Sequence, residues 1–186
     1  MAKASSGVEV WLSDYPDENI LHRLNQNVMR NDLESRCRVV GHIWGSRDVV
    51  ASSWDVSPGN NLNHRAPFEL APSFDALTGI FDIVVAADTL WNRDSHLALL
   101  DSIMHLLKPS SESRAIIVAG LHTGRYTLQR FISLAEETGF VFTAIMEQRV
   151  HGTDERPWDV EREGEDDSAR RDWVICMELR LMGRCG

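Results

Sequence analysis

The sequence predicts an α/β protein whose sheet is mostly parallel, ends in an antiparallel pair of strands and carries helices on both faces. Three observations support this fold. Strand-like and helix-like segments alternate along most of the 186 residues, which is the order of parallel α/β folds. Residues 81–87 and 115–119 are continuous apolar runs, as expected of parallel strands buried on both faces. The last two strand-like segments, 140–148 and 172–181, are separated by a charged loop and predict the antiparallel pair.

The first half of the chain supplies two strands and one helix. Residues 8–13 are strand-like, and Pro16 followed by two acidic residues marks a helix start, because proline fits the first turn and acids favour the positive end of the helix dipole. Apolar residues at three- and four-residue spacing continue this helix to about Asn31. A second strand is expected over 38–44. The stretch 46–79 is rich in turn-favouring residues and predicts an irregular surface excursion with one short helical turn.

The second half of the chain completes the alternation. Helices are expected over 95–107 and 126–138, after the two buried strands, and Gly139 is suited to cap the second helix. Residues 152–171 are charged and interrupted by proline, which is most simply a solvated loop. We expect residues 1–186 to form a single domain.

The composition excludes several classes of function. A formal net charge of −9 without a basic stripe argues against binding to nucleic acid or to a membrane surface. No apolar run approaches the about 20 residues of a membrane span, and the first residues lack the apolar core of a signal peptide. Three cysteines (37, 176 and 185) and seven histidines show no paired spacing, so neither a disulfide framework nor a metal site is expected. We therefore expect a cytoplasmic protein, with the nucleus as the alternative.

Four groups of residues follow predicted strands at the edge of the sheet where ligands of α/β proteins bind. They are Asp14, Trp44–Gly45, Asp88–Asn92 and Gly120–Gly124. Asp14 can accept hydrogen bonds from ribose hydroxyls, or it can cap the following helix. Trp44 can stack on an adenine ring where Gly45 lets the backbone approach, or it can pack at the strand end.

The other two groups, Asp88–Asn92 and Gly120–Gly124, also contain side chains or N–H groups that can bind a ligand. The carboxylate of Asp88 directly follows a buried strand, where it needs a positive charge, a donor or water; an amine-bearing ligand or a helix amino terminus would serve. Trp91 can face a cation with its ring. The Gly120–Gly124 loop can present N–H groups to an anion or be an ordinary loop, and His122 is a candidate general base. The sequence has no nucleophile elbow, dinucleotide glycine fingerprint or Walker loop.

Three short segments, in this order and spacing, resemble one known family. They are Asp-Tyr-Pro-Asp at 14–17, Gly-His-Ile-Trp-Gly at 41–45, and Phe-Asp-Ile at 81–83 continuing to Ala-Asp-Thr-Leu-Trp-Asn at 87–92 with His96. From Val8 to Leu181 the chain resembles the seven-strand S-adenosylmethionine-dependent methyltransferases, specifically their fungal nicotinamide N-methyltransferase-like branch. That branch includes enzymes that methylate the amino terminus and a lysine of elongation factor 1-alpha. The resemblance implies a truncated Rossmann-like class I methyltransferase fold.

The resemblance also implies roles for individual residues. Cofactor-binding residues would be Asp14, Tyr15, Trp44, Gly45 and Asp88, and residues of the catalytic site would be Asp88, Trp91, Asn92 and His122. The implied cofactor is S-adenosylmethionine, and the methyl acceptor is a protein amine or a small molecule. Methyl transfer needs a neutral amine, alignment and a closed site more than a strong acid or base.

The chain departs from this family in three ways, one of which is that Arg93-Asp94 alters the turn after Asn92. Trp91 stands where the family usually has Phe or Tyr. In addition, the family's first strand and its Gly-rich cofactor loop have no counterpart in the seven residues before Val8. That strand lies between the strands ending at Asp14 and Ala87, and its loss would leave backbone groups unpaired at about 1–3 kcal/mol each. The neighbouring strands could pair directly, a second copy or a full-length methyltransferase could complete the sheet, or the sequence is a fragment.

Three functions are therefore open. The first is an S-adenosylmethionine-dependent methyltransferase. The second is a non-methylating pseudoenzyme that binds a partner. The third is a repurposed cyclase or isomerase of the pericyclase type in a fungal natural-product pathway, with an apolar cavity lined by Trp44 and Trp91.

Overall fold

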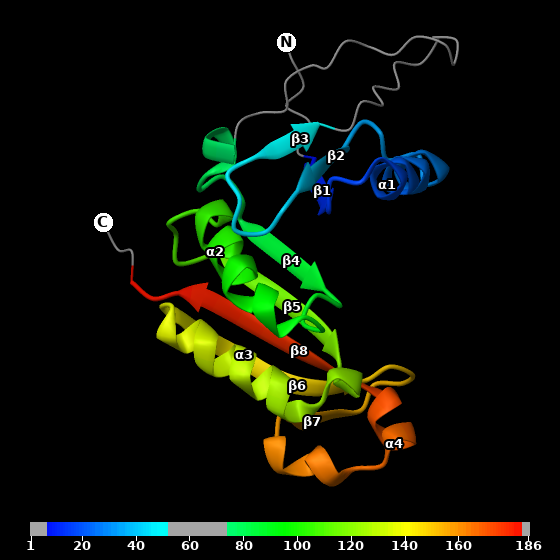
Figure 1. Cartoon of the computed structure of the whole chain (residues 1–186), viewed down its shortest axis with the longest axis vertical. Helices are drawn as coiled ribbons and strands as arrows, with labels where there is room; N and C mark the ends of the chain where they lie inside the picture. Colours follow the sequence, from blue (N-terminus) through cyan, green and yellow to red (C-terminus); the bar gives the residue numbers. More distant parts are fainter. Residues whose placement is uncertain (1–6, 52–73, 184–186) are drawn as a thin grey trace. The chain divides into compact units, whose positions relative to one another are not determined.

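The computed structural model describes residues 7–51 and 74–183 (Figure 1). Contacts between residues divide the chain into two compact units, Met1–Ala76 and Leu77–Gly186, and each unit is described by itself. The organisation as a single domain stays a prediction.

The first unit is a three-stranded sheet with one helix. Its elements are β1 (Val10–Asp14), α1 (Glu18–Arg30), β2 (Cys37–His42) and β3 (Val49–Ala51). β1 pairs with β2 in parallel, as predicted, and β3 adds an antiparallel pair with the end of β2. β3 lies at the start of the expected excursion, most of which falls outside the described residues; a 3-10 turn over Phe74–Leu77 follows it.

The local sequence explains where α1 begins and what it covers. The carboxylate of Asp17 accepts hydrogen bonds from the backbone N–H groups of Asn19 and Ile20, so Asp17 is the N-cap. The alternative role of Asp14 as this cap is therefore wrong. The helix packs on β1 and β2 through a small core of buried and half-buried side chains. The core residues are Leu21, Val28, Val39, Leu12, Leu24 and Cys37.

The second unit is a five-stranded sheet in the order β4-β5-β8-β6-β7 (Figure 1). Its strands are β4 (Ile83–Ala87), β5 (Arg114–Gly120), β6 (Phe140–Arg149), β7 (Glu155–Pro157) and β8 (Trp173–Leu181). Its longer helices are α2 (His96–Leu106) and α3 (Arg125–Glu137), with short 3-10 turns η2 (Arg93–Ser95) and η3 (Leu121–Thr123) before them.

The orientation of the strands differs from the prediction of a mostly parallel sheet. Only β1–β2 and β4–β5 are parallel among the strand pairs of the described residues, and four pairs are antiparallel. The predicted antiparallel pair, β6–β8, is confirmed. The prediction failed because β8 inserts antiparallel between β5 and β6, and because the short strands β3 and β7 form antiparallel pairs at sheet edges. The fold is therefore α/β with sheets of mixed orientation.

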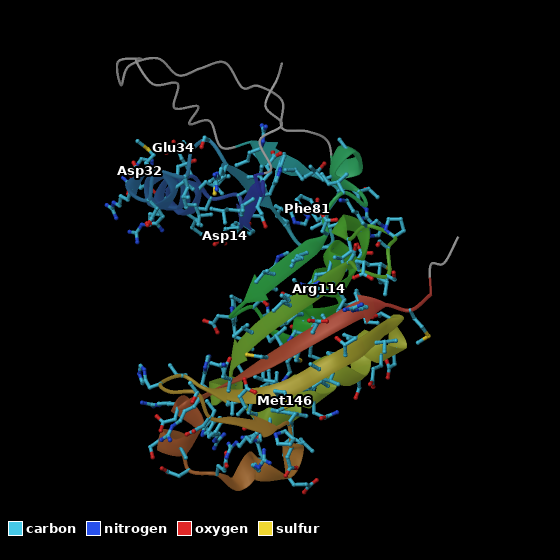
Figure 2. The ribbon with its side chains drawn as sticks, turned by 180° about the vertical axis from the view of Figure 1, so that it is seen from behind. Asp14, Asp32, Glu34, Phe81, Arg114 and Met146 are labelled. Carbon is cyan, nitrogen blue, oxygen red and sulfur yellow. The ribbon has the colours of Figure 1, made fainter. Side chains whose placement is uncertain are left out.

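Helices cover one face of the five-stranded sheet in the part of the chain that the structure describes. α2 and α3 contact each other, and Figure 2 shows the opposite face without a helix over it. Burial alternates along β5, where Ala115, Ile117 and Ala119 are buried and the residues between them are half-buried. The prediction of helices on both faces is thus wrong for this sheet, because its strands are less buried than their apolar runs suggest.

Residues 152–171 are not a solvated loop. They form β7, the 3-10 turn η4 (Val160–Gly164) and the short helix α4 (Asp167–Arg171). β7 pairs with β6, η4 contacts α3, and α4 contacts η3. Arg156 and Arg162 of this segment donate hydrogen bonds to Glu147 on β6, whereas Asp154, Glu155 and Glu161 are exposed. A count of charged residues does not reveal this difference.

The two strands that would flank the family's first strand are both edge strands. Among the described residues, β1 is hydrogen-bonded to β2 alone within its sheet, and β4 to β5 alone within the other. β4 contains no charged residue, and Val85 is 64% exposed.

None of the described helices is long and apolar enough to cross a membrane.

Candidate functional site

Two groups of predicted site residues lie at the carboxyl ends of parallel strands, one group in each unit. In the first unit, Asp14 ends β1 opposite Gly41 of β2 (Figure 2). A Cβ at Gly41 would lie 2.7 Å from the Cβ of Pro16, so glycine is needed for the turn after β1 to pack on β2. Asp14 is exposed, and its Oδ1 accepts a hydrogen bond from the backbone N–H of Tyr15 at 2.7 Å. The other carboxylate oxygen makes no hydrogen bond with a described residue.

Trp44 and Gly45 lie in a tight turn just beyond β2. The backbone N–H of Ser46 donates to the carbonyl of Ile43, and Gly45 has a φ of 77°, which favours glycine at this place. The predicted strand over 38–44 therefore ends two residues early, at His42. Because Gly41 pairs with Asp14 and the turn follows directly, the structure confirms that these residues share one edge of the three-stranded sheet.

His42 anchors this turn. Its ring is buried, and its Nε2 donates to the carbonyl of Ser46 at 3.2 Å. Burial lowers the pKa of His42 below its ordinary value; the hydrogen bond to Ser46 opposes the shift, and the charge of Arg47 adds to it. The ring is therefore held neutral beside the Trp44 turn.

In the second unit, Asp88 ends β4 with an unusual backbone conformation. Its φ is 55°, a left-handed value that costs energy for a residue other than glycine. Its backbone N–H donates to the carbonyl of Val118 on β5, which fixes the residue at the sheet edge. The exposed carboxylate makes no hydrogen bond or ion pair with another described residue. Asp32, just after α1, has a similar φ of 54°, and Asp enters the left-handed region more readily than most residues, so this conformation marks Asp88 as a candidate only together with its position at the sheet edge.

The residues after Asp88 divide into buried and exposed ones. Leu90 is 1% exposed and anchors the loop, whereas Trp91 is 65% exposed. The Oγ1 of Thr89 is buried without a partner among the described residues. Asn92 caps η2, since its Oδ1 accepts from the backbone N–H of Asp94 and its Nδ2 donates to Ser95. The helix cap in this loop is thus Asn92, and Asp88 does not take that alternative role.

His122 lies in the η3 turn after β5, the strand next to β4. Its side chain is exposed, and its ring lies against Gly120, where a Cβ would require the ring to move. The predicted anion site in this loop is filled by the protein itself. A Glu163 oxygen accepts a hydrogen bond from the backbone N–H of Arg125 at the amino terminus of α3.

Sequence reasoning missed a cluster of buried charges beside this turn. Arg125 and Glu147 are both fully buried and form an ion pair at 2.5 Å. Burial by itself would raise the pKa of Glu147, but hydrogen bonds from Arg125 and Arg156 outweigh it and hold the pKa below its ordinary value. The available signal was a glutamate in the strand-like segment 140–148, since a charge in a buried strand requires a partner.

The site shows no metal chemistry within the described ranges. No group of His, Cys, Asp and Glu side chains in residues 7–51 and 74–183 could hold a metal ion.

The chain is similar to curated protein methyltransferases of fungi. It is 28% identical over 152 residues to the protein N-terminal and lysine N-methyltransferase EFM7 of Gibberella zeae, a match that covers 76% of this chain and 52% of that protein. It is 26% identical over 145 residues to efm7 of Emericella nidulans, covering 74% and 49%. The chain thus spans about half the length of the curated relatives it matches. No family model matches the sequence.

Solved structures show that the fold is that of methyltransferase-like proteins. A putative sarcosine dimethylglycine methyltransferase from Galdieria sulphuraria matches with a TM-score of 0.54 and 13% identity, covering 96% of this chain and 71% of that one. The [4+2]-cyclase SpnF matches with a TM-score of 0.57 and 10% identity, covering 95% and 68%. At these identities the comparison concerns the fold alone.

Proposed function

We propose that this protein transfers a methyl group from S-adenosylmethionine to an amine of a protein. The observation that carries the proposal is the similarity to protein N-terminal and lysine N-methyltransferases, combined with the strained, unpaired carboxylate of Asp88 at the end of β4. A carboxylate at this position accepts a hydrogen bond from an amine acceptor and orients its lone pair.

The first unit fits the nucleoside part of the cofactor. Asp14 has a free carboxylate oxygen for the ribose hydroxyls, and Tyr15 beside it is 59% exposed. Trp44 is half-buried in the turn after β2, where Gly45 leaves the backbone open for the adenine ring to approach. When bound, the cofactor supplies an electrophilic methyl group on a sulfonium.

The second unit supplies the groups that receive the acceptor. The acceptor nitrogen must be neutral to attack in line with the departing sulfur, so one proton leaves an ammonium substrate before or during transfer. Asp88 holds the amine, and the exposed ring of Trp91 stabilises the cationic methylammonium product. His122 is exposed on the adjacent turn, and its proposed role is to accept the proton of the acceptor amine. Asn92 acts indirectly, by capping the loop that carries Trp91.

The other two functions have no specific observation in their favour. The similarity to a [4+2]-cyclase is a likeness of fold, and a methyltransferase matches with nearly the same TM-score. A pseudoenzyme would bind a partner without transferring a methyl group. We also propose a cytoplasmic location, where protein acceptors are available.

The test is a transfer assay with three matched peptides. The first has a free amino terminus and a lysine, the second is acetylated at its amino terminus, and the third carries Arg in place of the lysine. Incubation with S-adenosylmethionine is expected to add the mass of a methyl group to at least one peptide, and Asp88→Asn should lose this activity. Cofactor binding without transfer to any peptide or to total cellular protein would favour the pseudoenzyme.

A further inference from the structure

The first residue of α3, Arg125, is the centre of a buried cluster of charges. Its guanidinium donates to both carboxylate oxygens of Glu147, at 2.5 and 2.9 Å, and neither side chain is exposed. It also donates to Glu165 at 2.8 Å and to the carbonyl of Asp159 at 3.2 Å. The Trp158 ring lies against it, 5.2 Å from the guanidinium carbon to the ring centroid. Arg125 thereby joins α3 to β6 and to the segment 155–165.

Two more arginines complete the cluster. Arg156 and Arg162 donate to Glu147 at 2.8 and 2.9 Å, and Arg156 also forms two hydrogen bonds with Glu165. Three guanidinium groups therefore surround one buried carboxylate. This arrangement is what binds the charged segment after β6 to the sheet.

A buried cluster of charges contributes little net stability by itself. Removing charges from water carries a large penalty, and apolar side chains of similar volume often serve a protein core as well or better. The Nε of Arg125 is also buried without a partner among the described residues, which adds to the penalty. Charged groups instead fix the geometry, because several directional hydrogen bonds can be made together in only one arrangement.

The geometry that this cluster fixes belongs to the candidate site. Arg125 follows the turn that carries His122, and its backbone N–H donates to Glu163. Two residues later, still in the first turn of α3, Thr127 accepts hydrogen bonds from both the Nε and Nη2 of Arg93. Arg93 follows the loop that carries Asp88 and Trp91. The first turn of α3 is thus hydrogen-bonded to the loop after β4 and continuous with the loop after β5.

We propose that Arg125 is a positioning residue that holds these two loops in one arrangement. Through Glu147 it fixes the first turn of α3 on β6, and through Thr127 and Arg93 that turn fixes the loop after β4. Its consequence for catalysis rests on the proposed methyl transfer, whereas its effect on the loops does not.

The test replaces the buried pair by apolar residues of similar size. Arg125→Met combined with Glu147→Leu removes both charges of the buried pair. Of the two arginines that also lose Glu147, Arg156 keeps its hydrogen bonds to Glu165 and Arg162 keeps its ion pair with Asp159. Amide hydrogen exchange read by mass spectrometry is expected to accelerate about tenfold in residues 88–95 and 120–124, while β5 and β8 keep their protection. The matched control is Arg149→Met combined with Asp172→Leu, an exposed pair that involves the same strand, and it should change neither loop. Unchanged exchange in both loops of the folded double variant would overturn the proposal.

A second variant decides the matter if the double variant does not fold. Thr127→Val is nearly isosteric and removes only the acceptor of Arg93, whose side chain is exposed and can be rehydrated. Exchange should accelerate in residues 88–95 and stay unchanged in residues 120–124. Equal exchange of both loops in Thr127→Val and the native protein contradicts the proposed connection.

The kinetic measurement separates positioning from simple stability. In the transfer assay, at a temperature where both proteins are folded, the double variant should lose about tenfold in kcat with an unchanged KM for S-adenosylmethionine. Arg125→Lys, which keeps the charge, should recover more activity than Arg125→Met. A native protein that transfers no methyl group would refute the proposed function, while the exchange measurement would still decide the role of Arg125.

Discussion

The two units of this chain hold their site residues in different ways. The first unit has a small core around Leu21, Val28 and Val39, whose side chains are 6–8% exposed. The second unit has many side chains at 0–1% exposure, among them Leu128, Phe131 and Ile175, together with the buried Arg125 cluster. Local unfolding costs less free energy where fewer side chains are buried. The backbone around Asp14 should therefore exchange its amide hydrogens faster than the backbone around Asp88.

This difference fits the chemistry that each group is proposed to perform. A cofactor site has to admit and release a ligand, which a thinly packed sheet permits. An acceptor site has to keep a carboxylate and an aromatic ring in fixed relation, and a small misplacement there is costly to the rate. Each of the following changes is expected to affect one unit and to leave the other unit intact.

The largest effect is expected from breaking the buried pair on one side only. Arg125→Met leaves the carboxylate of Glu147 in the interior without its main partner, and the second unit should lose about 3–5 kcal/mol of stability. Urea unfolding followed by hydrogen exchange locates the loss. Arg149→Met, which breaks exposed pairs two residues further along β6, should leave the midpoint unchanged. Equal midpoints for Arg125→Met and the native protein would show that the cluster is structurally neutral.

Acid should weaken the second unit through the same cluster. The folded pKa of Glu147 is depressed, so its contribution is complete above its ordinary value of 4.5 and is lost as the pH falls below that value toward the folded pKa. Exchange protection of β5, β6 and β8 should therefore decrease below about pH 4.5. In the Arg125→Met, Glu147→Leu variant this acid-dependent decrease should be smaller. An identical decrease in both proteins would assign the acid sensitivity to other groups.

The first unit should respond at a higher pH. The folded pKa of His42 is lowered by burial, so its contribution is present above the unfolded value of 6.5 and declines as the pH falls below it. Protection of β1, β2 and α1 should decrease as the pH falls from 6.5 toward 4.5, an interval in which the Glu147 cluster is still intact. His42→Gln keeps a donor for the Ser46 carbonyl and removes the titration. Its protection should be independent of pH over this interval.

A smaller change is expected from the cap of α1. Asp17→Ala removes the acceptor for the N–H groups of Asn19 and Ile20 and should cost about 1 kcal/mol. The loss should appear in the exchange of α1 alone. Faster exchange in the second unit as well would show that the units unfold together and that their contrast is not real.

Sequence reasoning located most elements because their signals are local. The apolar runs and the helical periodicity placed β4, β5, α1, α2 and α3 within a few residues, and the expected antiparallel β6–β8 pair is present. The insertion of β8 between β5 and β6 depends on contacts between distant residues, and so do β3 and β7. For the same reason the sheets are less parallel than predicted.

The same distinction between local signals and contacts of distant residues applies to the candidate site. The positions of Asp14, Trp44, Asp88 and His122 near strand ends could be predicted, because strand ends are visible in the pattern of apolar residues, whereas their roles stay predictions. Which acid caps which helix was not predictable, since Asp14 and Asp17 both precede α1, and only the structure shows that Asp17 takes this role. The Arg125 cluster was missed because its partners come from three separate segments.

The central claim is that the first unit binds S-adenosylmethionine through Asp14, and calorimetric titration of the whole chain tests it most directly. We expect measurable binding, weakened by about 1–3 kcal/mol in Asp14→Ala, the scale of a lost charge-assisted hydrogen bond. Asp17→Ala, which changes a neighbouring acid that caps α1, should bind like the native protein once folded. The absence of heat at high micromolar ligand, or equal affinities of Asp14→Ala and the native protein, would contradict the account.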